Sequence, residues 1–362
     1  MKVHPTFSFR AAAVALSAAC IISAAACRHS GGRVLEVAYV SGVQVSLRDR
    51  VAAVYERVGT VKNGDRVEVL DHDRRFSKVR NAAGQMGWIE QRYLVSQQVF
   101  DQLQKLTTDN ANDPVQAQGV TRNDTNLHVE PGRDTEHLYQ INTGEKLALL
   151  KRGTAEKPGS AMPGRATPSG ATSYGATSGA KSRGKSGERA TDKKESAVIE
   201  DWWLVRDSHG RIGWVLARMV DLDVPIEVAQ YAEGQRIVAF FVLDQVTDGD
   251  KKVAQYLTAL TEPKDGLPFD FNQFRVFTWN VRKHRYETAY RERIEGVLPV
   301  SVGQEDFGKE GVLPMFVIRA LDENGKVVER KYKLSTPIVR RVTAPGEEPQ
   351  KIMRKRSPRH KH

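Results

Sequence analysis

The sequence predicts a mainly β protein in which two small barrels precede an antiparallel, sandwich-like β domain, with a disordered insert and tails. Short runs of alternating apolar and polar residues, separated by glycines, occur twice between residues 34 and 222. Longer alternating runs follow from residue 224. Apolar residues make up 40% of the 362 residues and charged residues 27%, which is enough to bury cores in two or three domains.

The first 27 residues have the pattern of an export signal. Lys2 and Arg10 precede an uncharged apolar run over residues 11–26, which ends in three alanines before Cys27. As a helix this run would span about 24 Å, which is short for a bilayer core of about 30 Å. The run therefore indicates a secretory signal peptide.

The cysteine directly after small residues resembles a bacterial lipoprotein signal. The resemblance implies that Cys27 becomes an acylated first residue and that the mature protein is anchored to the membrane, facing the periplasm. Ala24 stands where that family usually has leucine, and a plain signal that leaves a soluble periplasmic protein is the alternative. Cys20 and Cys27 are the only cysteines, which excludes a disulfide scaffold and a thiol enzyme in the mature chain.

One pattern of short strands occurs twice. The first copy has strands at 45–48, 64–70, 76–80 and 84–89, and the second has them at 127–130, 144–150, 202–206 and 210–215. The interval from Gly84 to Trp88 equals that from Gly210 to Trp214. Short alternating strands with glycine turns are typical of a small barrel.

Both copies resemble bacterial SH3-like (SH3b) domains, whose pattern is L-N-V-R, G-x-x-V-x-V, W-x-x-V and G-x-x-G-W-V. The first copy has Phe76 where the family has tryptophan, and the second has Glu130 where the family has arginine. The resemblance implies one barrel at 34–97, which we call the first module, and another at 117–222, the second module. It also implies binding of peptidoglycan, a peptide or a protein.

Seven aromatic residues are candidates for a groove that stacks against a peptide or a sugar ring: Tyr55, Phe76, Trp88, Tyr139, Trp202, Trp203 and Trp214. Because side chains alternate along a strand, Trp202 and Trp203 cannot both face the core, and one of them is predicted to point outward. For Trp88 and Trp214 the favoured alternative is packing inside the barrel cores.

Two further segments interrupt the repeat. Helical spacing of apolar residues over 97–107 predicts a helical spacer within 98–116. Residues 153–197 are predicted to be a disordered insert, since 27 of the 35 residues over 153–187 are Gly, Ser, Ala, Thr or Pro. The insert contains the spacing of a phosphate-binding loop at 179–186, but no strand or helix pattern flanks it, so no nucleotide cofactor is predicted.

The C-terminal segment 224–343 has strand patterns at 237–243, 275–281, 315–321 and 326–332, which predict an antiparallel sandwich or barrel. Its stretch 279–293 is rich in aromatic and charged residues; a hairpin with cross-paired charges is favoured over a ligand site. Asp270 and Glu287 are kept as a candidate carboxylate pair. The histidines, His284 included, have no metal-ligand spacing, so no metal site is predicted.

The net charge of +11 is unevenly distributed. The signal segment carries +2, segment 151–197 carries +6, and residues 351–362 of the predicted disordered tail 344–362 carry +6, which leaves −3 on the rest. This distribution disfavours a specific nucleic-acid-binding domain. It is compatible with attraction of the basic tail to anionic envelope polymers, and a solubilising tail is the alternative.

These observations predict a non-catalytic cell-envelope protein whose SH3-like modules bind peptidoglycan peptides or a partner protein. The sequence contains neither the G-x-S-x-G nor the H-E-x-x-H pattern, and the mature chain has no cysteine nucleophile, so no enzyme activity is expected. Two alternatives remain: a cell-wall-targeted hydrolase with its activity in the C-terminal β domain, and a purely structural assembly subunit.

Overall fold

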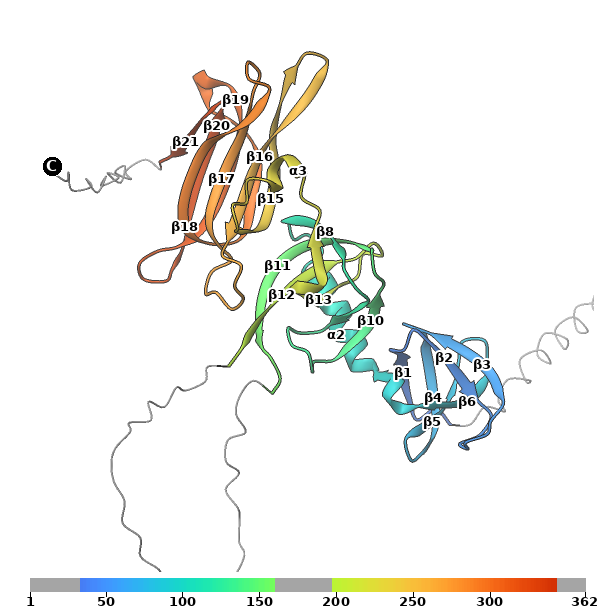
Figure 1. Ribbon diagram of the computed structural model, residues 1–362. Coiled ribbons are helices and arrows are strands. Elements are labelled where there is room, and N and C mark those ends of the chain that lie inside the picture. The colour runs from blue at the N-terminus through green and yellow to red at the C-terminus, as the bar shows by residue number, and fades with distance from the viewer. Residues whose placement is uncertain (1–32, 160–196, 344–362) are drawn as a thin grey trace, which may run out of the picture. The chain divides into compact units, whose positions relative to one another are not determined.

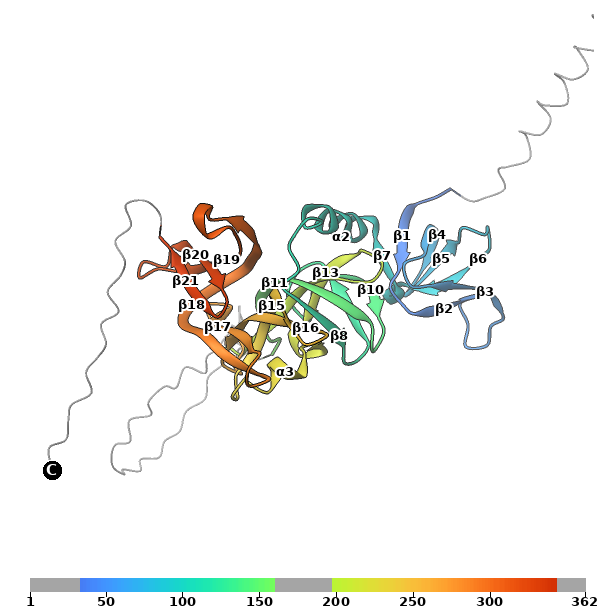
Figure 2. The same cartoon turned by 90° about the horizontal axis from the view of Figure 1, so that it is seen from above.

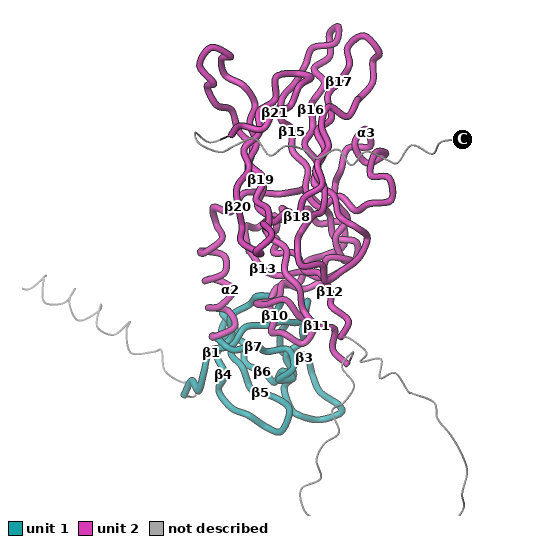
Figure 3. The backbone as a smooth tube through the Cα atoms, turned by 90° about the vertical axis from the view of Figure 1, so that its left-hand side faces the viewer, with its two compact units in different colours: residues 1–97 teal, residues 98–362 magenta. Residues whose placement is uncertain are grey.

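The computed structural model describes residues 33–159 and 197–343 (Figure 1). The predicted export signal with Cys27, the segment 179–186 and the basic tail lie outside the described residues. The chain divides between Gln97 and Gln98 into two compact units (Figure 3). The first unit contains the first module, and the second contains both the second module and the C-terminal sheet.

The first module is one antiparallel sheet that curves into a small barrel, with strand order β3-β2-β6-β5-β4-β1-β7. Its elements are β1 (Glu36–Val40), β2 (Gln44–Arg48), β3 (Arg57–Lys62), β4 (Arg66–Asp73), β5 (Phe76–Arg80), β6 (Met86–Glu90), the 3-10 helix η1 (Gln91–Tyr93) and β7 (Leu94–Ser96).

The second module has the same topology, with strand order β10-β9-β13-β12-β11-β8-β14. Its elements are β8 (Ala117–Thr121), β9 (Thr125–His128), β10 (His137–Ile141), β11 (Lys146–Glu156), β12 (Ile199–Arg206), β13 (Ile212–Leu216), the 3-10 helix η2 (Ala217–Met219) and β14 (Val220–Leu222). Each strand thus has a counterpart at the same place in the other sheet, as the repeated spacing implies.

Glycines at two kinds of position explain the Gly-x-x-Gly-Trp pattern. Gly84 and Gly210 have φ values of 79° and 80°, which glycine adopts without strain in the tight turn before β6 and β13. Gly87 and Gly213 lie on strands, where a Cβ atom would come within 2.7 Å and 2.8 Å of the Cβ atoms of a neighbouring leucine. These glycines therefore let two strands approach closely in both barrels.

The core of the first module is formed by small aliphatic side chains: Ala38, Val40, Leu47, Val61, Val67, Val69, Val79 and Ile89. No tryptophan belongs to this cluster. The interior of the barrel is therefore filled mainly by β-branched residues at alternate positions of short strands. Such residues pack well on strands that are buried on one face.

Helix α2 (Gln97–Asp109) follows β7 in the chain and packs on the second module. Val99 and Leu103 are buried, and Leu106 packs on Leu150, Leu204 and Ile212 of the second module. The Thr107 hydroxyl also accepts a hydrogen bond from the Ile212 amide. The helix is thus part of the second module's packing.

The C-terminal sheet contains seven antiparallel strands that pair in chain order, from β15 to β21 (Figures 1 and 2). They are β15 (Arg236–Asp248), β16 (Lys251–Thr261), β17 (Phe271–Asn280), β18 (Arg285–Asp306), β19 (Val312–Leu321), β20 (Val327–Ser335) and β21 (Ile338–Val342), with the short helices α3 (Ile226–Ala229) before β15 and η3 (Gly308–Glu310) before β19. The predicted mainly β, antiparallel fold class is confirmed, and within it this sheet is a continuous meander.

The predicted insert begins later than expected. Strand β11 continues to Glu156 and pairs with β12 through Glu156 and Ile199, so residues 153–156 are strand. Alternation is hard to recognise there because Gly153-Thr-Ala-Glu156 has no apolar side chain larger than alanine. Residues 160–196 lie outside the described part. Among the described helices, none has the length and apolar character needed to cross a bilayer.

Candidate functional site

Strand register identifies the equivalent residues of the two modules. Trp88 pairs with Arg48 in the first module, and Trp214 pairs with His128 in the second. His128 thus takes the place of Arg48, whereas the sequence alignment had put Glu130 there. The prediction was two residues out of register because Leu127 and Val129 both fit the apolar position, and only strand pairing decides between them.

Trp88 and Trp214 lie on the outer faces of the barrels. In the first module the adjacent Ile89 belongs to the core cluster, and Trp88 points to the opposite face. Trp214 packs on Leu204 and Ile212 in the cluster under α2. The favoured prediction that Trp88 fills a barrel core is therefore wrong, because alternation along β6 places Ile89 inside and Trp88 outside. Trp214 does pack against a hydrophobic cluster, but that cluster lies under α2 on the outer face of the barrel.

An arginine stacked between two rings dominates the outer face of the first module. The Arg48 guanidinium carbon lies 4.2 Å from the ring centre of Tyr55 and 5.1 Å from that of Phe76. Its Nη2 atom donates to Glu90 at 3.2 Å, and Glu90 also pairs with Arg92 at 2.9 Å. Phe76 is buried beneath this layer, while Tyr55 remains 39% exposed.

Two hollows open on either side of Arg48. One, of about 450 Å³, is lined by Gly42, Val43, Gln44, Val45, Ser46, Arg48, Tyr55, Glu90, Arg92 and Tyr93. The other, of about 500 Å³, is lined by Arg48, Val51, Ala52, Ala53, Arg74, Arg75 and Phe76. We call the two together the Arg48 groove. It offers ring faces and guanidinium groups, a combination suited to ligands that carry carboxylates on an apolar or planar body.

The backbone at the edge of the Arg48 groove is strained. Arg74 has a φ of 54°, in the left-handed region that glycine and asparagine enter most easily. It lies in the tight turn between β4 and β5, next to Arg75. Arg74 thus adopts a left-handed backbone conformation that is unfavourable for a residue with a long side chain, and its guanidinium group lines the Arg48 groove.

The corresponding face of the second module is closed. Trp202 occupies the place of Phe76 and is only 2% exposed, and His128 contacts its ring edge at 5.2 Å between centroids. Burial, with a smaller contribution from nearby His137, lowers the pKa of His128 to about 4. Arg133 closes the rim through two hydrogen bonds of 2.6 Å to Glu200.

The remaining aromatic candidates do not gather in one groove. The ring of Tyr139 is buried and lies 4.4 Å from the Arg211 guanidinium carbon. Trp203 points to the opposite face of β12 from Trp202, as alternation requires, but it is 5% exposed. The prediction that one of this pair faces solvent is wrong, because segment 217–238 covers Trp203 and leaves it lining a cavity.

A buried ion-pair network joins the second module to the C-terminal sheet. Arg152 donates to Asp201 at 2.5 Å and to Asp270 at 3.3 Å, and Arg236 donates to Asp201 at 2.7 Å. Burial opposes ionisation of Asp201, but hydrogen bonds from Arg152 and the Gly266 amide hold its pKa below the ordinary value. Burial raises the pKa of Asp270, despite a hydrogen bond from the Leu298 amide.

Asp270 and Glu287 do not form a carboxylate pair. In the β17–β18 hairpin, Phe271 pairs with Gly296 while Thr278 pairs with Glu287, so the two acids stand near opposite ends. Seven residues of strand separate those pairs by about 23 Å. Glu287 is instead surrounded by hydrogen bonds from Asn280, Lys283 and Arg285, which lower its pKa to about 2.

The charged stretch 279–293 forms the hairpin between β17 and β18. The Trp279 indole donates to Asp248 at 2.8 Å, and His284 pairs with the same carboxylate oxygen at 2.6 Å. Inside the sheet, Glu292 accepts hydrogen bonds from Tyr290 and Tyr332 at 2.7 Å and 2.9 Å. These polar groups are paired with one another, as expected for groups that stabilise a sheet.

Glu145, Asp207 and His209 form a cluster whose oxygens and nitrogen lie within 4.8 Å of one another. Asp207 already accepts hydrogen bonds from the backbone amides of His209 and Arg211 and from the Arg211 guanidinium at 2.6 Å. That guanidinium would repel a cation at the same carboxylate. The cluster therefore stabilises the turn between β12 and β13.

Sequence reasoning missed the arginines. Arg48 stands at the arginine position of the L-N-V-R motif, whereas the predicted groove candidates are all aromatic. Arg152 and Asp201 carry no local signal, because their significance depends on a contact with residues 265–270 far along the chain. The motif position of Arg48 was the one signal that could have placed a cation in the groove.

Residues 44–95 match the bacterial SH3 domain family. Among solved structures, the chain is similar to an NlpC/P60 family protein from Bacillus cereus ATCC 10987 (11% identity, 70% of this chain and 93% of that chain, TM-score 0.22). It is also similar to NlpC2 from Trichomonas vaginalis (10% identity, 86% and 97%, TM-score 0.16). At such TM-scores the likeness does not extend to the arrangement of the whole chain. A search of curated proteins found no match. The family match and the barrel topology agree, so the segment 44–95 of this chain is a bacterial SH3 domain.

Proposed function

We propose that this protein is a non-catalytic cell-envelope protein that binds peptidoglycan peptides through the Arg48 groove of its first module. One observation carries the proposal: equivalent faces of two barrels with the same topology are open in the first module and closed in the second. A purely structural role for both modules does not account for the difference, in which one module leaves an exposed ring and several cations open to solvent.

The chemistry of the groove suits a short peptide with free carboxylates. Arg92 has a side chain 68% exposed, and among the described residues its ionic partner is Glu90, which also pairs with Arg48. A carboxylate can therefore bind Arg92 through charge-assisted hydrogen bonds. The half-exposed ring of Tyr55 supplies a stacking surface beside it. Peptidoglycan stem peptides combine carboxylates with small apolar residues, and an exported protein meets them in the envelope.

Export and anchoring complete the proposal. The signal at 1–27 directs the chain out of the cytoplasm, and acylation of Cys27 would hold it on the membrane facing the periplasm. If so, palmitate label should be incorporated into the wild-type protein and lost in Cys27→Ser. Label that persists in this variant, or none in the wild type, would favour a soluble periplasmic protein.

The proposed role needs no catalytic group. Asp270 is engaged by Arg152 and Glu287 by three basic or amide side chains, so neither is placed as a general base for hydrolysis. Muropeptide release by the full chain would contradict the proposal and support a hydrolase.

Retention of the full chain on purified peptidoglycan tests the groove. Tyr55→Ala should weaken binding about five- to tenfold, because it removes the exposed stacking surface worth about 1 kcal/mol. Met86→Ala is the matched control, since Met86 is 44% exposed on the same module but lines neither hollow. Equal retention of both variants would remove the Arg48 groove from the account. No retention of the wild type would leave a protein partner or a structural role.

A further inference from the structure

The two hollows of the Arg48 groove differ in charge. The hollow of about 450 Å³, which we call the Arg92 hollow, is lined by two arginines and by Glu90, which pairs with both of them. The hollow of about 500 Å³, which we call the Arg75 hollow, is lined by three arginines and by no acidic residue. Arg48 is the one residue that lines both hollows, so they lie on either side of its side chain.

Arg74 and Arg75 have no carboxylate partner in the described part of the chain. Both residues are exposed, and neither side chain makes a hydrogen bond or an ion pair with any residue over 33–159 and 197–343. The Arg75 guanidinium carbon lies 5.8 Å from the ring centre of Phe76, and the Arg48 guanidinium carbon lies 5.1 Å from the same ring centre. Two positive charges therefore approach one ring, and no acid in the lining of the hollow offsets them.

A two-residue turn holds the arginine pair at the hollow. Asp73 pairs with Phe76, so Arg74 and Arg75 form the whole connection between β4 and β5. A turn of two residues has few backbone conformations. The backbone of both arginines is therefore fixed at the rim, while their side chains have no protein partner among the described residues.

The second module has no such turn. Its strands β11 and β12 remain paired beyond Trp202, the equivalent of Phe76, as far as Glu156 and Ile199. Further strand thus occupies the place that the arginine pair has in the first module. The arginine pair is a feature of the module whose outer face is open.

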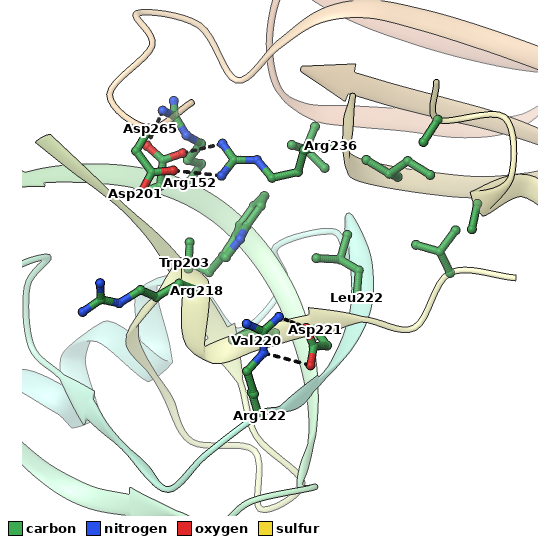
Figure 4. A pocket seen from close by; sticks show the side chains of 16 residues that line it. Arg122, Arg152, Asp201, Trp203, Arg218, Val220, Asp221, Leu222, Arg236 and Asp265 are labelled. Carbon is green, nitrogen blue, oxygen red and sulfur yellow. Dashed lines mark hydrogen bonds and ion pairs between the residues drawn. The ribbon is translucent and has the colours of Figure 1, made fainter. Parts of the chain in front are cut away.

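The cavity of the second unit shows how arginines are compensated elsewhere in the protein (Figure 4). In this cavity of about 480 Å³, Arg152 and Arg236 pair with Asp201, and Arg122 pairs with Asp221. Its fourth arginine lies 3.8 Å from a glutamate. The arginine pair of the Arg75 hollow lacks such acids and is therefore available to an anionic ligand.

We propose that the Arg75 hollow binds a second carboxylate of the peptide whose first carboxylate binds Arg92. This inference rests on the proposed function, and it names the ligand class: a peptide with a free side-chain carboxylate in addition to its terminal one. A planar guanidinium donates parallel N–H groups that match both oxygens of a carboxylate. The small apolar residues 51–53 line the same hollow and suit the methyl groups of the peptide. A side-chain amide has no negative charge and offers one oxygen, so it fits the hollow less well.

Calorimetric titration of the full chain with two tripeptides, N-acetyl-Glu-Ala-Ala and N-acetyl-Gln-Ala-Ala, tests the proposal. Both have a terminal carboxylate, and only the first has a side-chain carboxylate. An extended tripeptide spans about 10 Å, which allows one carboxylate on each side of Arg48. The glutamate peptide should bind at least about fivefold more tightly than the glutamine peptide, because it adds a charge-assisted pair.

Arginine variants identify the hollow. Arg75→Gln should reduce the preference for the glutamate peptide, and Arg74→Gln combined with Arg75→Gln should abolish it. Arg66→Gln is the matched control and should preserve the preference, since Arg66 is 54% exposed on the same module and lines neither hollow. The thermal unfolding of the double variant should match that of the wild type, because neither side chain has a partner in the described residues.

Two results would overturn the inference and leave the proposed function standing. The two peptides could bind equally, with both weakened in Tyr55→Ala, or the preference could persist in the double variant, which would place the second carboxylate elsewhere. If neither peptide binds below about 10 mM, the inference is also wrong. Retention of the wild type on peptidoglycan then decides separately whether the proposed function stands.

Discussion

Asp201→Ala should strongly destabilise the second unit. The Asp201 carboxylate is 2% exposed and accepts hydrogen bonds from Arg152, Arg236 and the Gly266 amide. The Arg152 side chain is itself only 7% exposed. Removing the carboxylate would leave this guanidinium buried with the weaker contact to Asp270 as its remaining ionic partner.

The expected loss follows from that burial. Removing one member of a buried ion pair costs about 3–5 kcal/mol, because the remaining charge is desolvated without compensation. For a unit of this size, about 2–4 °C of melting temperature is lost per kcal/mol, so the transition should fall by about 6–20 °C. The matched control is Asp221→Ala, whose pair with Arg122 is about half exposed and should contribute at most about 1 kcal/mol.

Calorimetry of the full chain measures both variants. Its transition for the second unit should move far more in Asp201→Ala than in Asp221→Ala. If the two shifts are alike, or if Asp201→Ala is within about 1 kcal/mol of the wild type, the network does not hold the second module to the C-terminal sheet.

Three further predictions concern packing and ionisation. Gly296→Ala should destabilise the second unit by at least about 2 kcal/mol in urea unfolding, since a Cβ atom would overlap the ring of buried Phe271. Gly303→Ala is the control and should be near neutral, because the nearest atom to its Cβ would be the Met315 sulfur at 3.8 Å. Equal losses in the two variants would contradict the close packing of Phe271 on Gly296. The pKa of His128 is about 4 in the folded chain, against 6.5 for the free side chain, so the unfolded state binds a proton at a higher pH than the folded state does. The unfolding free energy should therefore fall as the pH is lowered from 6.5 to 4. If the dependence of the unfolding free energy on pH is unchanged in His128→Gln, the shifted pKa of His128 is refuted. By NMR the Glu287 carboxyl should titrate near pH 2, and an ordinary value near 4.5 would mean that its three donors do not engage it.

The topology of both barrels could be predicted because its signals are local. The turn glycines Gly84 and Gly210 and the strand glycines Gly87 and Gly213 recur at one spacing, and each has the same structural reason in both copies. Alternating apolar residues between them define the inner face of each strand. Local patterns of this kind determine the strands and their turns.

Whether the outer face of each module is open or closed could not be predicted, because it depends on which side chains pack on that face. Phe76 and Trp202 occupy equivalent positions, yet one lies under an open groove and the other under a closed face. The difference comes from the residues around them, with Arg48 and Tyr55 in one module and His128 with the Arg133–Glu200 pair in the other. A single strand sequence contains no information about such neighbours.

The most direct test of the account is a map of ligand contacts on the full chain. Soluble peptidoglycan peptides added to isotopically labelled protein should shift the NMR signals of Arg48, Tyr55 and Arg92 at low ligand concentration. Signals around Trp202 and His128 should not move, since that face is closed. Shifts centred on the second module's outer face, with none at Arg48 and Tyr55, would contradict the claim that the first module is the one open for binding.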